Sequence, residues 1–200
     1  MNSDFKIAMK HTLVYLLKVI IAAIVIGLLY KEQTLVTIIL GLRIAYRINK
    51  YRVDKQNVVI PVIGMLVTGT LGTVIEYYGT KFGYWEYHDI NTQLPKYLFF
   101  VWMLAFTFMY NLETKIFKSL SKPTRSKKLM YIFAIVLVFP TVGEIITIYF
   151  GVWTYYFPYK FWGVSPHTIV SIAMVHLLVN YVISIYCKKR FIKDVVLNPS

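Results

Sequence analysis

The chain has 200 residues, of which 58% are hydrophobic and only 16% charged, and this balance excludes an ordinary soluble domain of this length. Its net charge of +13 would fit nucleic-acid binding, but the 22 basic residues lie between the apolar segments and form no single stripe. We therefore expect a polytopic membrane protein that binds no nucleic acid. The single cysteine, Cys187, excludes an internal disulfide.

Six apolar segments predict six helices in one all-α membrane domain over residues 1–200. The predicted helices cover residues 12–30, 34–48, 58–80, 97–112, 129–150 and 167–187. About 20 residues are needed to cross the hydrocarbon core of a bilayer. The second segment is short of this length, because its apolar part covers only residues 34–46, so it crosses only if Arg43 and Arg47 extend to the headgroups.

The basic residues predict an orientation. On a six-helix arrangement, 17 of the 22 Lys and Arg residues fall on one side of the membrane. The opposite side holds Lys31, Lys81, Lys96 and Lys160, while Lys18 lies within the first helix and is expected to extend to the cytoplasmic headgroups. Because cytoplasmic segments are enriched in Lys and Arg, we expect a multi-pass protein of the cell membrane with both termini in the cytoplasm. The count also favours a second helix that spans.

A motif at the end of the third predicted helix recurs 68 positions later. The matched residues are Glu76, Gly83, Trp85 and Tyr87 in the first copy and Glu144, Gly151, Trp153 and Tyr155 in the second. Such self-similarity indicates an architecture built from units. We predict two parallel hairpin repeats, residues 58–112 and 129–187, related by an axis along the membrane normal. The two glutamates should then approach each other near the outer face.

Glu76 and Glu144 are the candidate catalytic residues. Each lies about five residues before the outer end of its predicted helix, where an ionised carboxylate is costly unless it is paired or hydrated. Two carboxyl groups that face one cavity would provide a proton donor beside a proton acceptor. The structural alternative is a hydrogen bond from a tyrosine or a loop amide to each carboxylate.

Candidate ligand-binding residues lie in the two aromatic loops and on the sixth helix: Trp85, Tyr87, Trp153, Tyr155, His167, His176 and Asn180. The aromatic residues also fit a belt at the outer headgroups, but a belt does not require the same residues at matched distances from a glutamate. His176 and Asn180 are one helical turn apart and can share a polar face. His176 is expected either to exchange protons or bind ligand, or to be a packed, hydrogen-bonded residue.

Two other patterns concern packing and metal binding. Small or polar residues recur every four positions on one face of the third helix: Gly64, Thr68, Gly72, Glu76 and Thr80. Such a face suits close helix packing, and Asn111 near the inner end of the fourth helix is expected to cap or bridge helices.

The first aromatic loop also contains Glu86, His88 and Asp89, whose spacing matches no defined metal site. We expect no metal and no cofactor.

An intramembrane Glu followed by FGYWEY or FGVWTYY, and by a loop closed with LPKYLFF or VSPHTIV, resembles the repeats of the lycopene cyclase domain and of related carotenoid hydratase membrane proteins. The resemblance covers about half of the chain, from Glu76 to Ser171. It implies a helical membrane fold that acts on long isoprenoid hydrocarbons without a redox cofactor. The chain also looks like the uncharacterised small multi-pass membrane proteins of endospore-forming bacteria, a resemblance that implies no activity.

Three functions stay open on these grounds. The first is a membrane binding protein or enzyme for an apolar isoprenoid or lipid molecule, with Glu76 and Glu144 as proton donor and acceptor. The second is a non-catalytic assembly or scaffold subunit, in which the repeat packs two hairpins together. The third is transport, against which stands the absence of an acid at the inner side to match the two at the outer side.

Overall fold

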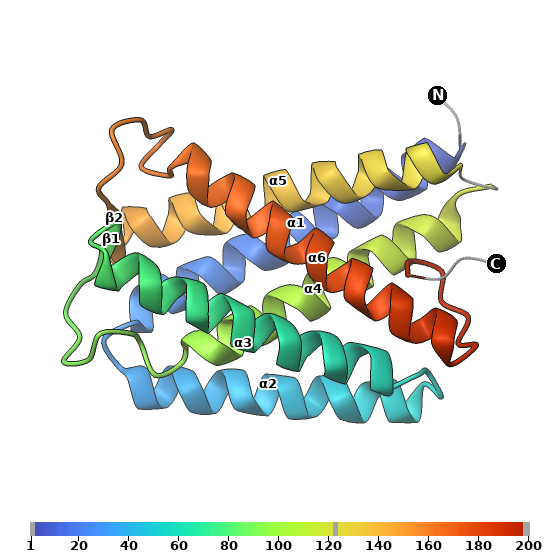
Figure 1. Cartoon of the computed structure of the whole chain (residues 1–200), viewed down its shortest axis with the longest axis horizontal. Coiled ribbons are helices and arrows are strands. Elements are labelled where there is room, and N and C mark those ends of the chain that lie inside the picture. Colours follow the sequence, from blue (N-terminus) through green and yellow to red (C-terminus); the bar gives the residue numbers. More distant parts are fainter. Residues whose placement is uncertain (1–2, 122–123, 198–200) are drawn as a thin grey trace.

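The computed structural model describes residues 3–121 and 124–197 and is an all-helical bundle (Figure 1). Its helices are α1 (Ser3–Leu29), α2 (Gln33–Val53), α3 (Val59–Lys81), α4 (Leu98–Ser119), α5 (Arg125–Tyr149) and α6 (Pro166–Lys189). Two short strands, β1 (Trp85–Tyr87) and β2 (Trp153–Tyr155), lie at one end of the bundle. Both ends of the chain lie at the opposite end (Figure 1). The all-α prediction is therefore confirmed for these residues.

Several helices extend beyond the predicted ends, and the extension of α4 matters most. The predicted fourth helix ended at residue 112, where the apolar run stops, whereas α4 continues to Ser119. Hydrophobicity marks the part of a helix that can face lipid, but the backbone hydrogen bonds continue through Glu and Lys, which are good helix formers. The correction places Glu113 inside a helix rather than in a connector.

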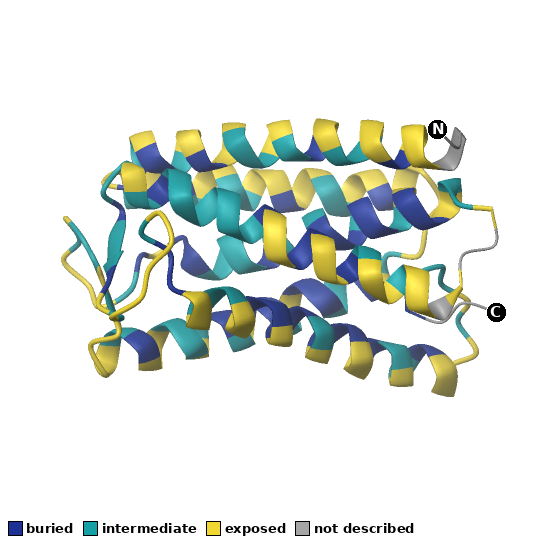
Figure 2. Cartoon of the chain, turned by 90° about the horizontal axis from the view of Figure 1, so that it is seen from above, coloured by how far each residue is buried: buried dark blue, intermediate teal, exposed yellow. Residues whose placement is uncertain are grey.

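Four helices of the described chain, α1, α3, α5 and α6, are long and apolar enough to cross a membrane. Large apolar side chains such as Leu13, Leu17 and Leu28 are exposed along α1, and exposed residues follow the outward faces of the helices (Figure 2). A bundle with apolar residues on its outside fits a lipid surround. The structure thus supports a membrane protein.

The other two helices fall short of this standard for different reasons. α2 carries Arg43, Arg47, Lys50 and Arg52 in its second half. α4 packs against α1, α2, α3 and α5, and its residues Phe106 and Leu112 are wholly buried. A helix surrounded by other helices has no need of a lipid-facing surface, so it can carry more polar residues.

The glycine face of α3 receives aromatic side chains from α4, which confirms the expected close packing. The Phe106 ring lies against Gly64, and the Trp102 indole lies against Gly72, so closely that neither glycine could carry a Cβ without displacement of the ring. At Gly69, a Cβ would lie 2.8 Å from Phe99. Because these glycines have no side chain, each aromatic ring can rest on the backbone of α3.

The two aromatic segments were predicted as loops, but part of each forms a strand, and the strands pair antiparallel. Trp85 lies opposite Tyr155, and Tyr87 lies opposite Trp153. Each strand follows a helix through a glycine with positive φ, +71° at Gly83 and +74° at Gly151. L side chains rarely adopt this conformation, so glycine allows each chain to turn from its helix into the strand.

Replacement of Gly72 by leucine should destabilise the bundle, because the new side chain would occupy the space of the Trp102 ring. We expect a loss of about 1–3 kcal/mol, the usual cost of overpacking, measured as a lower melting temperature in detergent. Thr70→Leu is the matched control, because Thr70 is exposed on the same helix. Equal melting temperatures for the two variants would contradict the close contact.

Candidate functional site

The halves of α3 and α5 next to the sheet, which we call the outer halves, bring Glu76 and Glu144 to one small cavity beneath the sheet. The cavity has a volume of about 50 Å³, enough for a few water molecules. Its lining is mainly apolar and aromatic: Ile75, Glu76, Trp85, Trp102, Glu144, Tyr155, Phe157, His167, Thr168, Ser171, Ile172 and Val175. Two carboxyl groups from different helices therefore share a cavity, as the matched motifs led us to expect.

Glu76 is held by the strand that follows its own helix. Its Oε2 accepts hydrogen bonds from the indole Nε1 of Trp85 at 2.8 Å and from the Tyr87 hydroxyl at 2.9 Å. Alternate residues of a strand point to the same side, so Trp85 and Tyr87 can both face the bundle. The residue between them, Glu86, is exposed and accepts a hydrogen bond from the Tyr156 hydroxyl at 2.7 Å.

Glu144 is held by the equivalent strand, with one difference. Its Oε2 accepts a hydrogen bond from the Tyr155 hydroxyl at 2.6 Å. The Trp153 indole lies near Glu144, but its buried Nε1 does not complete the hydrogen bond that Trp85 makes to Glu76. Glu144 thus has fewer donors than Glu76, so it is the carboxyl group with more need of a water molecule or a proton.

The tyrosines at this site are hydrogen-bond donors throughout the ordinary pH range. Burial, and then the neighbouring Glu76 carboxylate, raises the pKa of Tyr87 well above its usual range. Burial and then Glu144 do the same for the pKa of Tyr155. Both phenols therefore stay neutral and keep their protons. The hydrogen bonds required by the structural alternative are present, and they coexist with a shared cavity.

The paired strands also stack the aromatic side chains of the two motifs against each other. Trp85 meets Tyr155 edge to face with ring centroids 5.6 Å apart, and Tyr87 meets Trp153 in the same manner at 5.6 Å. Such edge-to-face pairs are favourable beyond the area that they bury. The sheet therefore connects the two glutamates mechanically, because each strand donates to its own glutamate while it packs on the other strand.

His167 lies at the mouth of the cavity, on the first turn of α6. Its ring stacks on Phe157 at 5.0 Å, and its backbone N–H donates to the Ser165 Oγ at 3.2 Å, which caps the helix. His167 and Ser171 are exposed members of the lining, so the cavity opens beside this part of α6. The structure thus places His167 in the outer site, whereas Tyr87 and Trp153 support the glutamates without lining the cavity.

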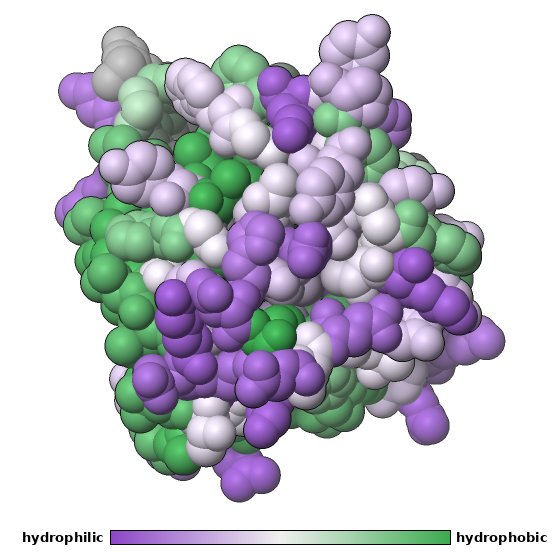
Figure 3. All heavy atoms as spheres, turned by 90° about the vertical axis from the view of Figure 1, so that its left-hand side faces the viewer, coloured by the Kyte–Doolittle hydropathy of each residue, from purple (hydrophilic) through white to green (hydrophobic). Residues whose placement is uncertain are grey.

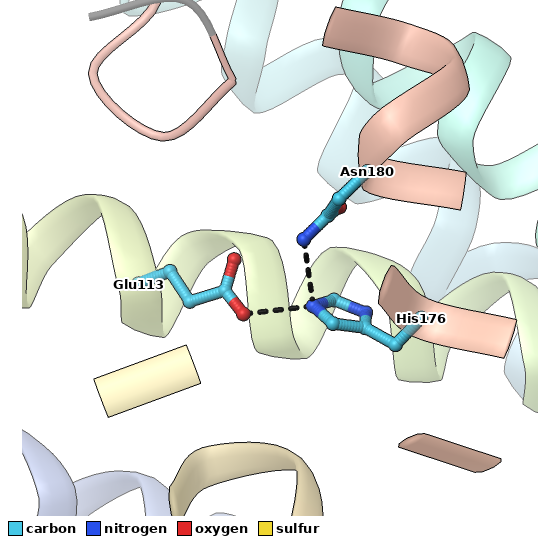
Figure 4. A network of polar contacts seen from close by, with 3 residues as sticks. All are labelled: Glu113, His176 and Asn180. Carbon is cyan, nitrogen blue, oxygen red and sulfur yellow. Dashed lines mark hydrogen bonds and ion pairs between the residues drawn. The ribbon is translucent and has the colours of Figure 1, made fainter. Parts of the chain in front are cut away.

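His176 and Asn180 lie outside this cavity and form a second polar cluster deeper in the bundle (Figure 4). Their partner is Glu113 of α4, whose Oε1 lies 2.7 Å from the His176 Nε2. The Asn180 amide lies 3.0 Å from the same nitrogen. Glu113 is 0% exposed and His176 2%, so an acid and a histidine are paired within the protein interior.

Glu113 was missed because the predicted fourth helix stopped one residue before it. A signal was available, since Phe106, Tyr110 and Glu113 follow the three-to-four-residue spacing of one buried helix face. The expectation that no acid lies at the inner side to match the two at the outer side was made without Glu113, a third acid, which is buried. His176 is a packed, hydrogen-bonded residue, but its partner is an ionisable one.

The buried cluster contains polar atoms that have no hydrogen-bond partner in the described part of the chain. Among the described residues, Glu113 Oε2, His176 Nδ1 and Asn180 Oδ1 are buried without a hydrogen-bond partner. One short contact joins the carboxyl group to the imidazole, so a proton on this line can belong to either group. The three atoms without partners can accept from or donate to a water molecule.

Other polar side chains of the outer loops hold the sheet in place. His88 contacts the Thr154 hydroxyl at 2.8 Å, and Asp89 accepts from the Tyr30 hydroxyl at 2.8 Å and pairs with Lys31 at 3.0 Å. The hydrogen bond to Lys31, followed by that to Tyr30, lowers the pKa of Asp89. Glu86, His88 and Asp89 thus point to different partners. Figure 3 shows hydrophilic side chains over much of this end of the molecule.

Asn111 bridges two helices, as expected. Its Nδ2 donates to the Tyr51 hydroxyl of α2 at 2.6 Å and to the backbone carbonyl of Thr107 at 2.5 Å. The bond to Tyr51 attaches the second half of α2 to the central helix α4. The basic part of α2 is thereby fixed against the bundle.

The buried pair predicts a strong energetic coupling. Glu113→Ala or His176→Ala alone leaves a buried partner unpaired, and each should cost about 3–5 kcal/mol of stability. The double variant should cost clearly less than the sum, because it leaves neither group unpaired. Melting curves in detergent measure this cycle, with the exposed Glu86→Ala as control. Additive effects would mean that the two groups do not interact.

No protein-family model matches this chain, and no curated protein or solved structure is similar to it. What the two clusters can do must therefore follow from their geometry. The outer cavity offers two carboxyl groups in an aromatic setting, and the buried cluster offers an acid and a base in contact.

Proposed function

We propose that the chain is a six-span protein of the cell membrane, made of two related hairpins, with both termini in the cytoplasm. The strand register supports the relation between the hairpins. A shift by 68 residues turns the pair Trp85 and Tyr155 into the pair Trp153 and Tyr87, which is also present. Such a register is what a two-fold axis through the sheet would produce. The charge distribution, with 17 of 22 basic residues on one side, supports the orientation.

We propose further that the outer cavity receives one end of an apolar lipid, of which isoprenoids are the favoured class. The observation that carries this proposal is the convergence of Glu76 and Glu144 on one cavity with a mainly apolar lining. The resemblance to carotenoid-modifying membrane proteins points to an unsaturated chain. That resemblance departs after the loop prolines, where those cyclases carry paired glutamates and this chain has Lys96 and His167. Ring formation is for this reason not part of the proposal.

The chemistry that suits such a site is proton transfer to and from a carbon–carbon double bond. A protonated glutamate would donate a proton to one carbon of the double bond, which leaves a carbocation at the other carbon. The second glutamate, as a carboxylate, would remove a proton from the carbon on the far side of that cation, so that the new double bond lies one position along the chain. The double bond moves, the atoms balance, and no redox cofactor is required. Glu144, with its single donor, suits the protonated role, and Glu76, which accepts from Trp85 and Tyr87, suits the ionised role.

Deuterium transfer tests both binding and chemistry. Purified protein in lipid nanodiscs is incubated in D2O with geranylgeraniol, and mass spectrometry measures deuterium incorporated on carbon. We expect incorporation by the wild type and none by Glu76→Gln or Glu144→Gln, because an amide side chain cannot act as the acid or the base of this reaction. The control Glu86→Gln changes a carboxyl group outside the cavity and should leave incorporation unchanged.

Binding can be followed separately through Trp85 and Trp102, which both line the cavity. Geranylgeraniol should change tryptophan fluorescence in a saturable way, whereas octadecanol, which is saturated and straight, should not. No fluorescence response and no deuterium transfer in the wild type would reject the lipid proposal. Glutamine variants that lose stability in that case would favour the non-catalytic assembly subunit.

Proton movement across the bundle is a second candidate, and the Glu113–His176 pair is the observation that favours it. On α6, Ile172 and Val175 line the outer cavity, and His176 comes next in the chain. The outer and inner acids are thus separated by a short apolar layer that includes Phe106, whose ring lies 6.3 Å from that of His176. Water in that layer would connect them.

Proteoliposomes with an internal pH dye and a valinomycin-driven potential measure this activity. If the second candidate is right, the wild type acidifies or alkalises the lumen faster than empty liposomes do. Glu113→Gln and His176→Gln should abolish the difference, because each removes a proton carrier, while Glu86→Gln should not. A wild-type rate equal to that of empty liposomes rejects proton movement.

A further inference from the structure

A second, larger hollow lies between α1 and α2, away from the glutamates. It has a volume of about 370 Å³. Seven of its eight lining residues are apolar: Ala22, Val25, Ile26, Val36, Ile39, Leu40 and Leu42. The eighth is Arg43, so this apolar groove has a single cation in its lining. Its walls belong to a helix apolar enough to span and to one that is not.

Five basic side chains from three helices gather at this place. Lys18 of α1 lies one turn below Ala22 and within electrostatic range of its four counterparts: Lys115 of α4 and Arg43, Arg47 and Lys50 of α2. The Lys18 and Lys115 ammonium groups lie 4.6 Å and 5.3 Å from the centre of the same Tyr15 ring. Lys18 and Lys115 are thus neighbours, and the three basic residues of α2 act on Lys18 electrostatically, so the repulsion among these cations needs an offset.

The described part of the chain offers no acid to these cations. The ion pairs found there join Lys31 to Asp89 and His176 to Glu113, and neither involves any of the five. The aromatic rings compensate in part, as Tyr15 does and as Tyr46 does for Arg43 at 5.5 Å. A ring attracts a cation by only about 0.5–2 kcal/mol and carries no net charge. The cluster therefore keeps a large positive field.

The cluster lies too deep in the proposed membrane for water alone to stabilise its positive charges. Lys18 lies eleven residues from the outer end of α1, and Arg43 lies ten residues from the outer end of α2. At helical rise these distances are about 17 and 15 Å, roughly half of a ~30 Å hydrocarbon core. Extension of each side chain toward the headgroups accounts for an isolated lysine. It does not account for five cations that converge beside an apolar groove.

We infer that this place binds an anionic phospholipid of the inner leaflet. The groove would hold an acyl chain against α1 and α2, and the five cations would hold the phosphate. Arg43 and Arg47 are suited to this because a guanidinium can donate two parallel hydrogen bonds to a phosphate. Basic pockets between helices on the cytoplasmic side are typical headgroup sites. A zwitterionic lipid has no net charge to offset the cluster, and a free phosphate has no chain for the groove.

Native mass spectrometry of the purified full-length protein tests the inference. Dioleoyl phosphatidylglycerol should bind with at least about tenfold higher affinity than dioleoyl phosphatidylcholine. Arg43→Gln/Arg47→Gln should remove most of this preference. The control Lys188→Gln/Lys189→Gln removes the same charge from the exposed end of α6 and should retain it. Glycerol phosphate, which has the anion without the chain, should not compete at equal concentration.

A separate substitution tests the role of the apolar groove. Ala22→Phe should fill it and weaken phosphatidylglycerol binding, because Ala22 belongs to its wall. Ala134→Phe places the same side chain at an exposed position on α5 and should not. Equal affinities for the two lipids in the wild type would overturn the inference. An equal loss of the preference for phosphatidylglycerol in both charge variants would also overturn it, because the protein would then attract the lipid by net charge alone. Competition by glycerol phosphate would overturn it as well, because the site would then bind phosphate without an acyl chain. None of these three outcomes bears on the outer glutamate cavity.

Discussion

A carboxyl group inside a membrane protein must find hydrogen-bond donors, and this constraint accounts for the architecture of the outer end. Glu76 accepts from residues 9 and 11 positions further on, and Glu144 accepts from the residue 11 positions further on. Those distances leave room for one more helical turn, a glycine turn and a strand. The strand must then curl back over the helix end, and it can do so because Gly83 and Gly151 adopt positive φ. Pairing of the two strands fixes both arrangements together.

Much of this outer site could be predicted from sequence, because it is encoded locally. The matched motifs contain the acid, the turn glycine and the donors within a dozen residues. What could not be read was the pairing between Trp85 and Tyr155, since the two segments look like loops when each is taken alone. Three-residue strands carry too little alternation to be recognised, and their register depends on the packing of the helices beneath.

The inner cluster illustrates the opposite case. Glu113 lies among basic and polar residues in the sequence, where an acid is ordinarily taken for a solvated group. Glu113 is buried because α4 is the central helix, so that neighbouring helices enclose its polar end. The hydropathy that identifies a lipid-facing helix fails for such a helix, and so the helix end and its buried acid are both misjudged. His176 and Asn180, on a plainly apolar helix, were recognisable as unusual, but their partner was not.

Helix α2 is likewise held by its neighbours, and its two halves lie toward the two ends of the molecule. Its first half is apolar and packs in the cluster that contains Tyr30, Val36, Tyr97 and Val152, beneath the outer sheet. Its second half is basic and is tied to α4 through Tyr51 and Asn111. A helix fixed at both ends in this way cannot slide outward to place its arginines in water. On the proposed six-span arrangement, the free energy of those cations is lowered where they stand, and the counter-charge that a membrane supplies is the phosphate of a lipid. A bound lipid would on this view be part of how the second helix is accommodated, much as Trp85 and Tyr87 are part of how Glu76 is.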